Sequence, residues 1–380
     1  MPSEFHLSDQ SHLIRPPSTD LAALIAAMRA GESVFVAPSS EFVPPAKPQY
    51  LFAQSSGSTG RPKIIRRTPQ SWKASFDVSR SRFGITEKDR YGVFGALQHS
   101  LALYATMEAF HLGADLAVME GMSPKAQATL ICDQKLSVLY VTPTQLTLLL
   151  RTNSTLPSVT HIFCGGGRLP APIVAQLPKA LPNATFREFF GASETSFITM
   201  SDATTPLGSV GQAYPGVTLE LKPTQGNASE IWVKSPYLFE DYAQGSSTST
   251  TYQNGFVAIG EMGRLDDFGN LYLLGRKDRM ITVADQNVFP ERIEALMEAQ
   301  PSIQGCAVIA LKDDLRGHRL VCLIEGQADV SQLRRLCRLC RETLGEAHTP
   351  HQFHTQTPLP RLAMGKPDLV RLRAQLEAIS

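Results

Sequence analysis

The sequence has almost no excess of charge of either sign. Thirty-six lysine and arginine residues stand against 35 aspartate and glutamate residues, so the formal net charge of the 380-residue chain is +1. Proteins that bind nucleic acid or an anionic membrane surface usually carry a surplus of positive charge. We therefore expect no nucleic-acid partner, and any polyanion that binds should be small and held by a local site.

Long apolar runs are missing as well. Residues 1–20 contain acids and prolines, with no apolar run behind a basic start, which argues against a secretory signal. Farther along, Pro143 or charged residues interrupt the apolar stretches, so we predict no membrane span. The hydrophobic fraction of 43% is still typical of a globular protein.

Cysteine is scarce, and the six cysteines form no disulfide framework in a chain of this length, which favours the reducing cytoplasm. Cys337 and Cys340 make a C-x-x-C pair that could indicate redox or metal chemistry. However, they share helical spacing with Leu333, Leu336 and Leu344, and no second pair completes a zinc site. We interpret both cysteines as part of the buried face of a helix.

Three histidines lie close together near the C-terminus, at His348, His351 and His354. Imidazole is a frequent metal ligand, so such a group could indicate a metal site. The segment around them is a proline-rich turn, and there we expect a solvated cluster instead.

From residue 50 to residue 190, short β-rich runs alternate with helical stretches. This alternation predicts β-α units around a parallel sheet, with ligands at the carboxyl ends of the strands. The predicted strands are residues 50–53, 91–96, 116–119, 137–141, 161–164 and 185–189, and the clearest helices are residues 101–112 and 143–151. One helix, 20–29, and one strand, 33–37, precede them.

Beyond residue 200 the pattern changes twice. Short strands separated by turns predict an antiparallel section, at residues 218–221, 230–233, 256–259 and 271–274. A small α+β unit follows, with a helix at 290–299, strands at 307–310 and 320–324, and the helix that holds the cysteines. We predict an α/β protein with a large domain, residues 1–275, and a small mobile domain, residues 276–380.

A loop rich in glycine and hydroxyl groups follows the first predicted strand. Its glycines let the backbone turn sharply towards an anion, its hydroxyls add neutral donors and its lysine adds a positive charge. The loop consists of Ser55, Ser56, Gly57, Ser58, Thr59, Gly60, Arg61, Pro62 and Lys63. It lacks the Walker spacing, and a flexible linker would gain nothing from the Arg-Pro-Lys at its end. We predict a different type of phosphate loop.

This segment resembles the signature loop of the adenylate-forming (AMP-binding) superfamily, which includes acyl-CoA synthetases, carrier-protein adenylation domains and luciferases. Further segments resemble the motifs of that family in the same order. They are Phe190-Gly191-Ala192-Ser193-Glu194, Gly260-Glu261 with Gly275-Arg276-Lys277-Asp278, and the segment from Pro360 to Lys366. The resemblance covers the chain from about Gln49 to the C-terminus.

The resemblance implies a role for each motif. Lys366 would contact both the substrate carboxylate and the α-phosphate of ATP, although an exposed surface lysine is the ordinary alternative. Glu194 would bind the Mg²⁺ that accompanies ATP, where the alternative is a solvent-facing carboxylate at a helix start. Phe190 would stack on adenine, and Gly191 and Ser193 belong to the same nucleotide-binding box.

Three further positions complete the implied nucleotide site. Glu261 stands where the family usually has an aspartate that accepts both ribose hydroxyls, and its extra methylene could alter nucleotide affinity. Arg276 would reach the ribose and phosphate, and Asp278 would be the hinge of the small domain. The glycines at 165 to 167, with Gly166 and Gly167 assigned to the nucleotide, would leave room for a flat base or an acyl chain, or would simply make a tight strand-to-helix turn.

His99 resembles the gate residue of the family's acyl pocket, although a histidine that caps the following helix is an equal alternative. No carboxylate stands beside it to pair with an α-ammonium group, which makes amino-acid substrates less favoured. Aromatic and aliphatic acids both remain open.

The resemblance thus implies an ATP- and Mg²⁺-dependent ligase that forms an acyl- or aryl-adenylate from a small carboxylic acid, releases pyrophosphate and passes the acyl group to CoA. A phosphopantetheinyl carrier protein is the alternative acceptor, and a catalytically silent nucleotide-binding module is an alternative of another class. Ala284-Asp285 replaces a Gly-Gly on the family's thiol route, which leaves the acceptor step open. Because only 54 residues precede Ser55, the N-terminal part is short, and a homodimer is one way to cover its face.

Overall fold

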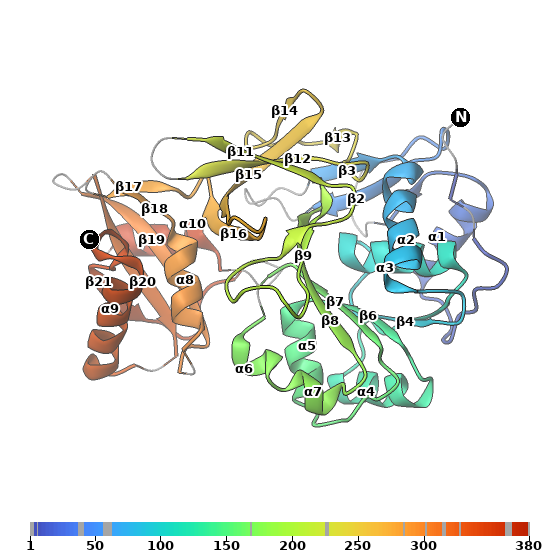
Figure 1. Cartoon of the computed structure of the whole chain (residues 1–380), viewed down its shortest axis with the longest axis horizontal. Helices are drawn as coiled ribbons and strands as arrows, with labels where there is room; N and C mark the ends of the chain where they lie inside the picture. The colour runs from blue at the N-terminus through green and yellow to red at the C-terminus, as the bar shows by residue number, and fades with distance from the viewer. Residues whose placement is uncertain are drawn as a thin grey trace.

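The computed structural model describes residues 4–5, 7–36, 42–55, 63–167, 169–224, 228–283, 286–300, 302–313, 317–326, 328–361 and 367–378. These residues form a mixed α/β structure with parallel and antiparallel sheets (Figure 1). In this part of the chain, no helix has both the length and the apolar character that a membrane crossing requires.

The largest sheet has seven strands in the order β10-β9-β8-β7-β6-β4-β5. Their bounds are β4 (Arg90–Val93), β5 (Asp115–Val118), β6 (Val138–Val141), β7 (His161–Gly165), β8 (Thr185–Ala192), β9 (Ser196–Met200) and β10 (Gln212–Ala213). The five strands from β8 to β5 are parallel, as the alternation predicted, whereas β9 and β10 extend the sheet in antiparallel fashion.

Helices cover both faces of this sheet (Figure 1). One face is covered by α2 (Pro69–Phe83) and α3 (Ser100–Leu112), and the other by α4 (Pro124–Asp133), α5 (Pro143–Leu150), α6 (Ala171–Val174) and α7 (Leu177–Ala180). Successive residues of β6 alternate between the two cores: Tyr140 packs with α2 and α3, and Leu139 and Val141 pack with α4 and α5. Burial on both faces explains why these strands are apolar throughout.

One strand expected in the parallel sheet lies elsewhere. The segment predicted at 50–53 is β2 (Leu51–Ser55), in a separate four-stranded sheet of order β1-β2-β3-β13. Its neighbours are β1 (Val34–Phe35), which follows helix α1 (Thr19–Arg29), β3 (Lys63–Arg67) and β13 (Asp241–Gln244). Sequence pattern predicts that a segment is extended but not which strand it pairs with, so the assignment to the parallel sheet was wrong.

The antiparallel section is confirmed. It comprises β11 (Thr218–Pro223), β12 (Ser229–Lys234), β15 (Phe256–Leu265), β14 (Thr251–Gln253) and β16 (Leu271–Arg276). Ile231, Val233, Val257 and Ile259 are buried in the core that this sheet shares with Phe239.

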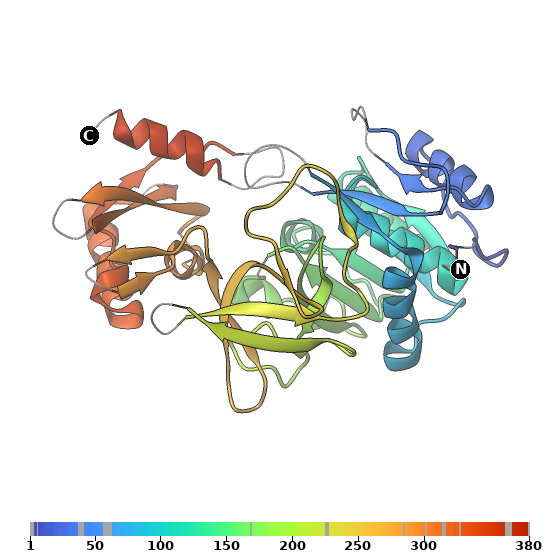
Figure 2. The same cartoon turned by 90° about the horizontal axis from the view of Figure 1, so that it is seen from above.

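From β17 onward the chain forms its own sheets and cores. The elements are β17 (Ile281–Val283), β18 (Gln286–Val288), α8 (Pro290–Glu298), β19 (Gly305–Asp313), β20 (Gly317–Glu325), α9 (Val330–Leu344), η1 (Glu346–His348), β21 (Gln352–Thr355) and α10 (Leu369–Glu377). Both Figure 1 and Figure 2 show this part to one side of the rest of the molecule. Helices α8 and α9 and strands β19 and β20 agree with the elements expected there.

Two expectations about side chains in this part have different outcomes. Leu336 and Cys340 on α9 are buried, as the apolar stripe predicted, and Cys337 is half-buried. The solvated histidine cluster is wrong for His348, which is only 7% exposed. Neither ring nitrogen of His348 has a hydrogen-bond partner among the residues that the structure describes, and burial lowers its pKa to about 4.

Candidate functional site

The two ends of the predicted phosphate loop are paired and lie beside the start of α3. Ser55, the last residue of β2, is opposite Lys63, the first residue of β3, in an antiparallel ladder. Gln54 forms a parallel bridge with His99, which directly precedes α3. The segment between the strands, with Ser56, Gly57, Ser58, Thr59 and Gly60, lies outside the described residues. The loop therefore joins the strands of a hairpin that ends next to His99.

His99 occupies the position before the first turn of α3, but its side chain makes no capping hydrogen bond. The capping interpretation is therefore wrong for the side chain. Burial lowers the pKa of His99, while the charge of Glu120 acts in the opposite direction. His99 is consequently a neutral imidazole at neutral pH, beside the hairpin that carries the loop.

Ser193 and Glu194 lie in the tight turn between β8 and β9, not at a helix start. The amide of Phe239 donates a 2.8 Å hydrogen bond to the carbonyl of Glu194. The hydroxyls of Ser193 and Ser100 are 2.8 Å apart, which connects the turn to the start of α3. The structure thus brings His99 and Glu194, which are far apart in the sequence, to the two ends of one short chain of contacts.

Tyr242, on β13, was not foreseen from the sequence. Its hydroxyl donates to Oε1 of Glu194 at 2.8 Å and lies 2.8 Å from the hydroxyl of Thr250. The Nζ atom of Lys63 lies 5.4 Å from the centre of its ring, within reach of a cation–π contact. Burial and the charge of Glu194 raise the pKa of Tyr242, so the phenol keeps the proton that it donates.

Glu261, Arg276 and Asp278 form a second group, which the structure also brings together. Glu261 on β15 is directly opposite Arg276 on β16, and Nη1 of Arg276 lies 3.2 Å from Oε1 of Glu261. Nε of Arg276 lies 3.1 Å from Oδ1 of Asp278. Burial opposes the charged form of Arg276, but the hydrogen bond to Asp278 and the charge of Glu261 outweigh it and raise its pKa.

The segment before β14 connects the two groups. Thr250 contacts Tyr242, as described above, and its neighbour Ser249 lies against Gly260. A Cβ atom on Gly260 would be 2.9 Å from Cβ of Ser249. Gly260 has a φ of +79°, and it directly precedes Glu261. Contacts of Ser249 and Thr250 therefore connect the turn that holds Glu194 with the strand that holds Glu261.

The glycines near β7 differ from one another. A Cβ atom on Gly165 would lie 2.1 Å from Cζ of Phe189, so the aromatic ring occupies the space beside this glycine. Room for a base or an acyl chain is therefore not available at Gly165. Gly166, with a φ of +88°, and Gly167 are exposed. These two glycines remain the ones that could face a ligand.

The aromatic-glycine box has its own packing requirements. Phe190 packs partly against the core of the antiparallel section. A Cβ atom on Gly191 would lie 2.0 Å from the carbonyl oxygen of Ser196, so glycine is required there by the close approach of β9. Close backbone packing explains Gly191 without any ligand.

Lys366 lies outside the described residues, as does the pair Ala284-Asp285. The flanks of the terminal lysine segment are described: Arg361 and Pro367 form an antiparallel bridge, and the amide of Asp368 donates to the carbonyl of Pro360 at 2.8 Å. The segment that carries Lys366 therefore begins and ends at one place, in front of α10.

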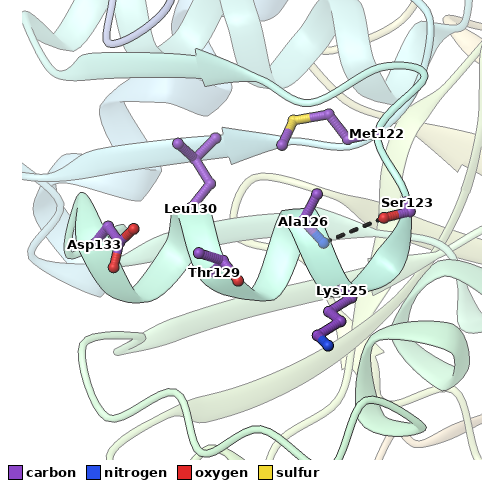
Figure 3. Close-up of a pocket in the computed structure, with 7 residues that line it drawn as sticks. All are labelled: Met122, Ser123, Lys125, Ala126, Thr129, Leu130 and Asp133. Carbon is purple, nitrogen blue, oxygen red and sulfur yellow. Dashed lines mark hydrogen bonds between the residues drawn. The ribbon is translucent and has the colours of Figure 1, made fainter.

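A hollow of about 450 Å³ lies on the surface of α4, away from these groups (Figure 3). Figure 3 shows its lining, which consists of Met122, Ser123, Lys125, Ala126, Thr129, Leu130 and Asp133. The dashed line there is the hydrogen bond from the amide of Ala126 to the hydroxyl of Ser123, which caps the helix. This lining holds none of the candidate site residues, so we place the site at the Glu194 turn instead.

Comparison with known proteins places this geometry in context. Residues 19–243 match the model of the AMP-binding enzyme family, and residues 292–366 match that of the AMP-binding enzyme C-terminal domain. An uncharacterized acyl-CoA ligase of Bacillus subtilis, YhfT, is 31% identical over 344 residues, which cover 88% of this chain and 70% of that protein. The 2-succinylbenzoate-CoA ligase of Bacillus velezensis is 28% identical over 325 residues, covering 82% and 66% of the two chains.

Solved structures agree with the sequence relatives. The o-succinylbenzoate CoA synthetase of Bacillus subtilis, in complex with its acyl-adenylate intermediate, matches with a TM-score of 0.76 at 25% identity. The match covers 85% of this chain and 68% of that one. Family model, relatives and fold all point to the same conclusion. The chain belongs to the AMP-binding enzyme family and is an AMP-forming ligase of the acyl-CoA synthetase type.

Proposed function

We propose that the chain uses ATP to convert a carboxylic acid into an acyl- or aryl-adenylate and then transfers the acyl group to CoA. The observation that supports this best is the grouping of Lys63, Tyr242 and Glu194 beside the ends of the phosphate loop. A cation and a carboxylate that both contact Tyr242 suit a bound nucleotide and its metal ion. The positive charge of Lys63 and the carboxylate of Glu194 are therefore the groups that an ATP-dependent ligase of this family needs.

In the first step, an oxygen of the substrate carboxylate bonds to the α-phosphorus of ATP, and the bond from that phosphorus to pyrophosphate breaks. The two reactants are both anions, so cations and hydrogen-bond donors must hold them together. We assign Lys366 to the carboxylate and α-phosphate, and Lys63 with the loop hydroxyls to the departing pyrophosphate. Neutral His99 would border the acid.

Glu194 suits a Mg²⁺ ion, because a hard cation prefers one or two carboxylates together with phosphate oxygens. Tyr242 holds one oxygen of this carboxylate by a hydrogen bond. When bound, Mg²⁺ supplies positive charge to the phosphates. Glu194 and Tyr242 would keep the ligand oxygen in place before the nucleotide arrives.

Glu261 and Arg276 are assigned to the ribose, and Phe190 with the exposed glycines to adenine. The ion pair between Glu261 and Arg276 supports the assignment, because it fixes the carboxylate that would accept two hydroxyls. Asp278 is the proposed hinge, and we place the domain boundary between residues 275 and 276. The small domain would turn there, between adenylation and thioester formation.

The second step needs a thiol that accepts the acyl group. The names of the relatives as CoA ligases support CoA, whose sulfur would attack the acyl carbonyl while AMP leaves. A carrier protein remains the alternative. Comparing the two thiols with the same acid would separate them, and equal product with and without either thiol would contradict both.

Two further parts of the proposal concern the cellular compartment and the oligomeric state of the enzyme. Six free cysteines support a reducing compartment such as the cytoplasm. The proposed homodimer is tested by sedimentation equilibrium of the purified chain. A single mass equal to one chain across the concentration range would reject the dimer.

The central experiment is hydroxamate trapping over a panel of aromatic and aliphatic acids, with ATP and Mg²⁺. We expect pyrophosphate release that depends on one class of acid. If no acid promotes release although MgATP binds, the chain is the silent nucleotide-binding module.

A further inference from the structure

Arg67, the last residue of β3, is a charged side chain that the family motifs do not explain. It is 1% exposed, which makes it one of the most deeply buried large side chains of the chain. We propose that Arg67 is a positioning residue that holds the Ser193–Glu194 turn, and with it the MgATP site, in its binding geometry. This inference rests on the proposed function and adds a residue to it.

The guanidinium donates hydrogen bonds to backbone carbonyls of two distant segments and to one nearby side-chain hydroxyl. Nε and Nη2 both donate to the carbonyl of Ser193, at 3.2 and 2.5 Å. Nη1 donates to the carbonyl of Tyr237 at 2.6 Å and to the hydroxyl of Ser71 at 3.4 Å. Hydrogen bonds from one side chain thus connect β3 with the Ser193–Glu194 turn and with the segment before β13.

These contacts fix the backbone of the turn from one side. Ser193 gives its carbonyl to Arg67, and the next residue, Glu194, gives its carbonyl to the amide of Phe239. With consecutive carbonyls held, the position of the Glu194 carboxylate is set by the backbone before any metal ion binds. Pre-organisation of this kind strengthens binding, because less freedom is lost when the ligand arrives.

The positive charge of Arg67 contributes to the site in addition to its hydrogen bonds. Its hydrogen-bond partners are two carbonyls and a hydroxyl, so the bonds described do not neutralise it. Burial lowers the pKa of Arg67 to about 9, and the charge of Glu194 acts to raise it. Arg67 therefore remains charged at neutral pH, and its positive potential offsets the negative charge of Glu194 where anionic phosphates must approach.

Arg66 provides a matched control, because it is the preceding residue of the same strand and its side chain points to the opposite face. Nη2 of Arg66 lies 2.6 Å from Oδ2 of Asp241, and its guanidinium lies over the ring of Tyr50. Its side chain is 33% exposed, and it makes no described contact with the Glu194 turn. Replacing Arg66 removes an equal charge without touching that turn.

The test measures MgATP binding directly by titration calorimetry, with the full chain and with Arg67→Met, Arg67→Lys and Arg66→Met. We expect Arg67→Met to weaken binding at least about tenfold, since the turn loses both its anchor and the compensating charge. Arg67→Lys should recover only part of this loss. An ammonium group restores the charge, but it cannot donate two parallel hydrogen bonds to one carbonyl as the guanidinium does. Arg66→Met should bind like the original protein.

Turnover measurements add a second readout. For Arg67→Met we expect a higher KM for MgATP and a higher Mg²⁺ concentration at half-maximal rate, with a smaller change in kcat. Folded Arg67→Met that binds MgATP as tightly as the original protein would overturn the inference. So would loss of folding in both Arg67→Met and Arg67→Lys, because the residue would then serve the fold alone.

The same experiments distinguish a failure of the proposed ligase function from a failure of the role proposed for Arg67. If the original protein binds MgATP but no acid supports pyrophosphate release, ligase activity is rejected while the role of Arg67 in binding still stands or falls on calorimetry. If the original protein binds no MgATP, both are rejected.

Discussion

The hydroxyl of Tyr242 donates a 2.8 Å hydrogen bond to the carboxylate of Glu194, and the ring of the same tyrosine lies within 5.4 Å of Nζ of Lys63. One side chain on β13 therefore touches the proposed metal ligand and the cation at the end of the phosphate loop. The residues that we assign to the Mg²⁺ ion and to the phosphates of MgATP therefore both contact Tyr242.

Replacing Tyr242 separates these contacts. Tyr242→Phe keeps the ring beside Lys63 but removes the hydrogen bond to a charged group, which typically contributes about 1.5 to 3 kcal/mol. We expect the Mg²⁺ concentration for half-maximal pyrophosphate release to rise roughly tenfold. Tyr252→Phe, on the neighbouring β14, should leave it unchanged, and an unchanged requirement in Tyr242→Phe would mean that Glu194 needs no such support.

Lys366 carries the prediction with the largest effect. Lys366→Ala should lower kcat for acid-dependent pyrophosphate release by about 10²- to 10³-fold, the usual loss when a positioned donor to developing charge is removed. MgATP binding should change little, because the loop and Glu194 are intact. Lys312→Ala, an exposed lysine of the same domain, is the control. Full turnover in Lys366→Ala would remove this lysine from the mechanism.

Gly165 and Phe189 should be coupled in stability. Gly165→Ala places a Cβ atom where the ring of Phe189 lies, 2.1 Å from Cζ, and such overpacking costs about 1 to 3 kcal/mol. Phe189→Leu in the same chain should recover part of that loss. Urea unfolding of the single and double variants measures the coupling, and Gly95→Ala, whose added Cβ would meet nothing nearer than 3.5 Å, is the control. Strictly additive losses would show that the ring moves aside freely.

His348 should make the fold sensitive to acid. Burial lowers its pKa from 6.5 to about 4, so the unfolded chain takes up a proton before the folded chain does. The contribution of neutral His348 to the free energy of unfolding is therefore complete above pH 6.5 and is lost as pH falls towards 4. His348→Phe should flatten the fall in the free energy of unfolding across this window. His354→Gln, an exposed neighbour, should not, and an equal slope in His348→Phe would contradict the assignment.

Glu108 should act in the opposite sense. This buried carboxylate on α3 accepts hydrogen bonds from Tyr91 and Tyr140, at 2.9 and 2.7 Å, and from Tyr104 at 3.2 Å. Burial raises its pKa from 4.5 to about 7, although these hydrogen bonds oppose the shift. The contribution of protonated Glu108 to the free energy of unfolding is therefore complete below pH 4.5 and is lost as pH rises to 7.

Glu108→Gln tests this, because the amide keeps the shape but cannot ionise. The free energy of unfolding of the original protein, relative to Glu108→Gln, should decrease between pH 4.5 and pH 7. Guanidinium unfolding at several pH values measures the difference. A difference that is constant with pH would show that Glu108 titrates normally despite its burial.

Much of the fold follows from local pattern. Apolar runs and helical spacing predicted β4 to β8, α3, α5 and α8 close to their observed bounds, and they also predicted the helix α9. The reason is that periodicity reports which face of an element is buried, and this is a local property. Pairing is not local, which is why β2 was assigned to the wrong sheet.

Some residues of the candidate site could likewise be predicted from the sequence, whereas others could not. Motif order placed Ser193, Glu194, Glu261, Arg276 and Asp278 in the sequence, and the structure brings the last three into contact. Tyr242 carried no signal, because a lone tyrosine in a strand is usually core. Arg67 carried no signal either, because the sequence does not show which backbone groups a buried side chain contacts.

The sequence by itself determined the family, since the glycine- and hydroxyl-rich loop, the aromatic-glycine box and the terminal lysine segment occur in one order. Only the tertiary structure decided that the loop joins a hairpin, that Phe189 fills the space beside Gly165, and that Arg67 grips the carbonyl of Ser193. Arg67 and Ser193 are separated by 126 positions. Contacts across such separations depend on how sheets and helices pack, and no spacing of residues along the chain encodes them directly.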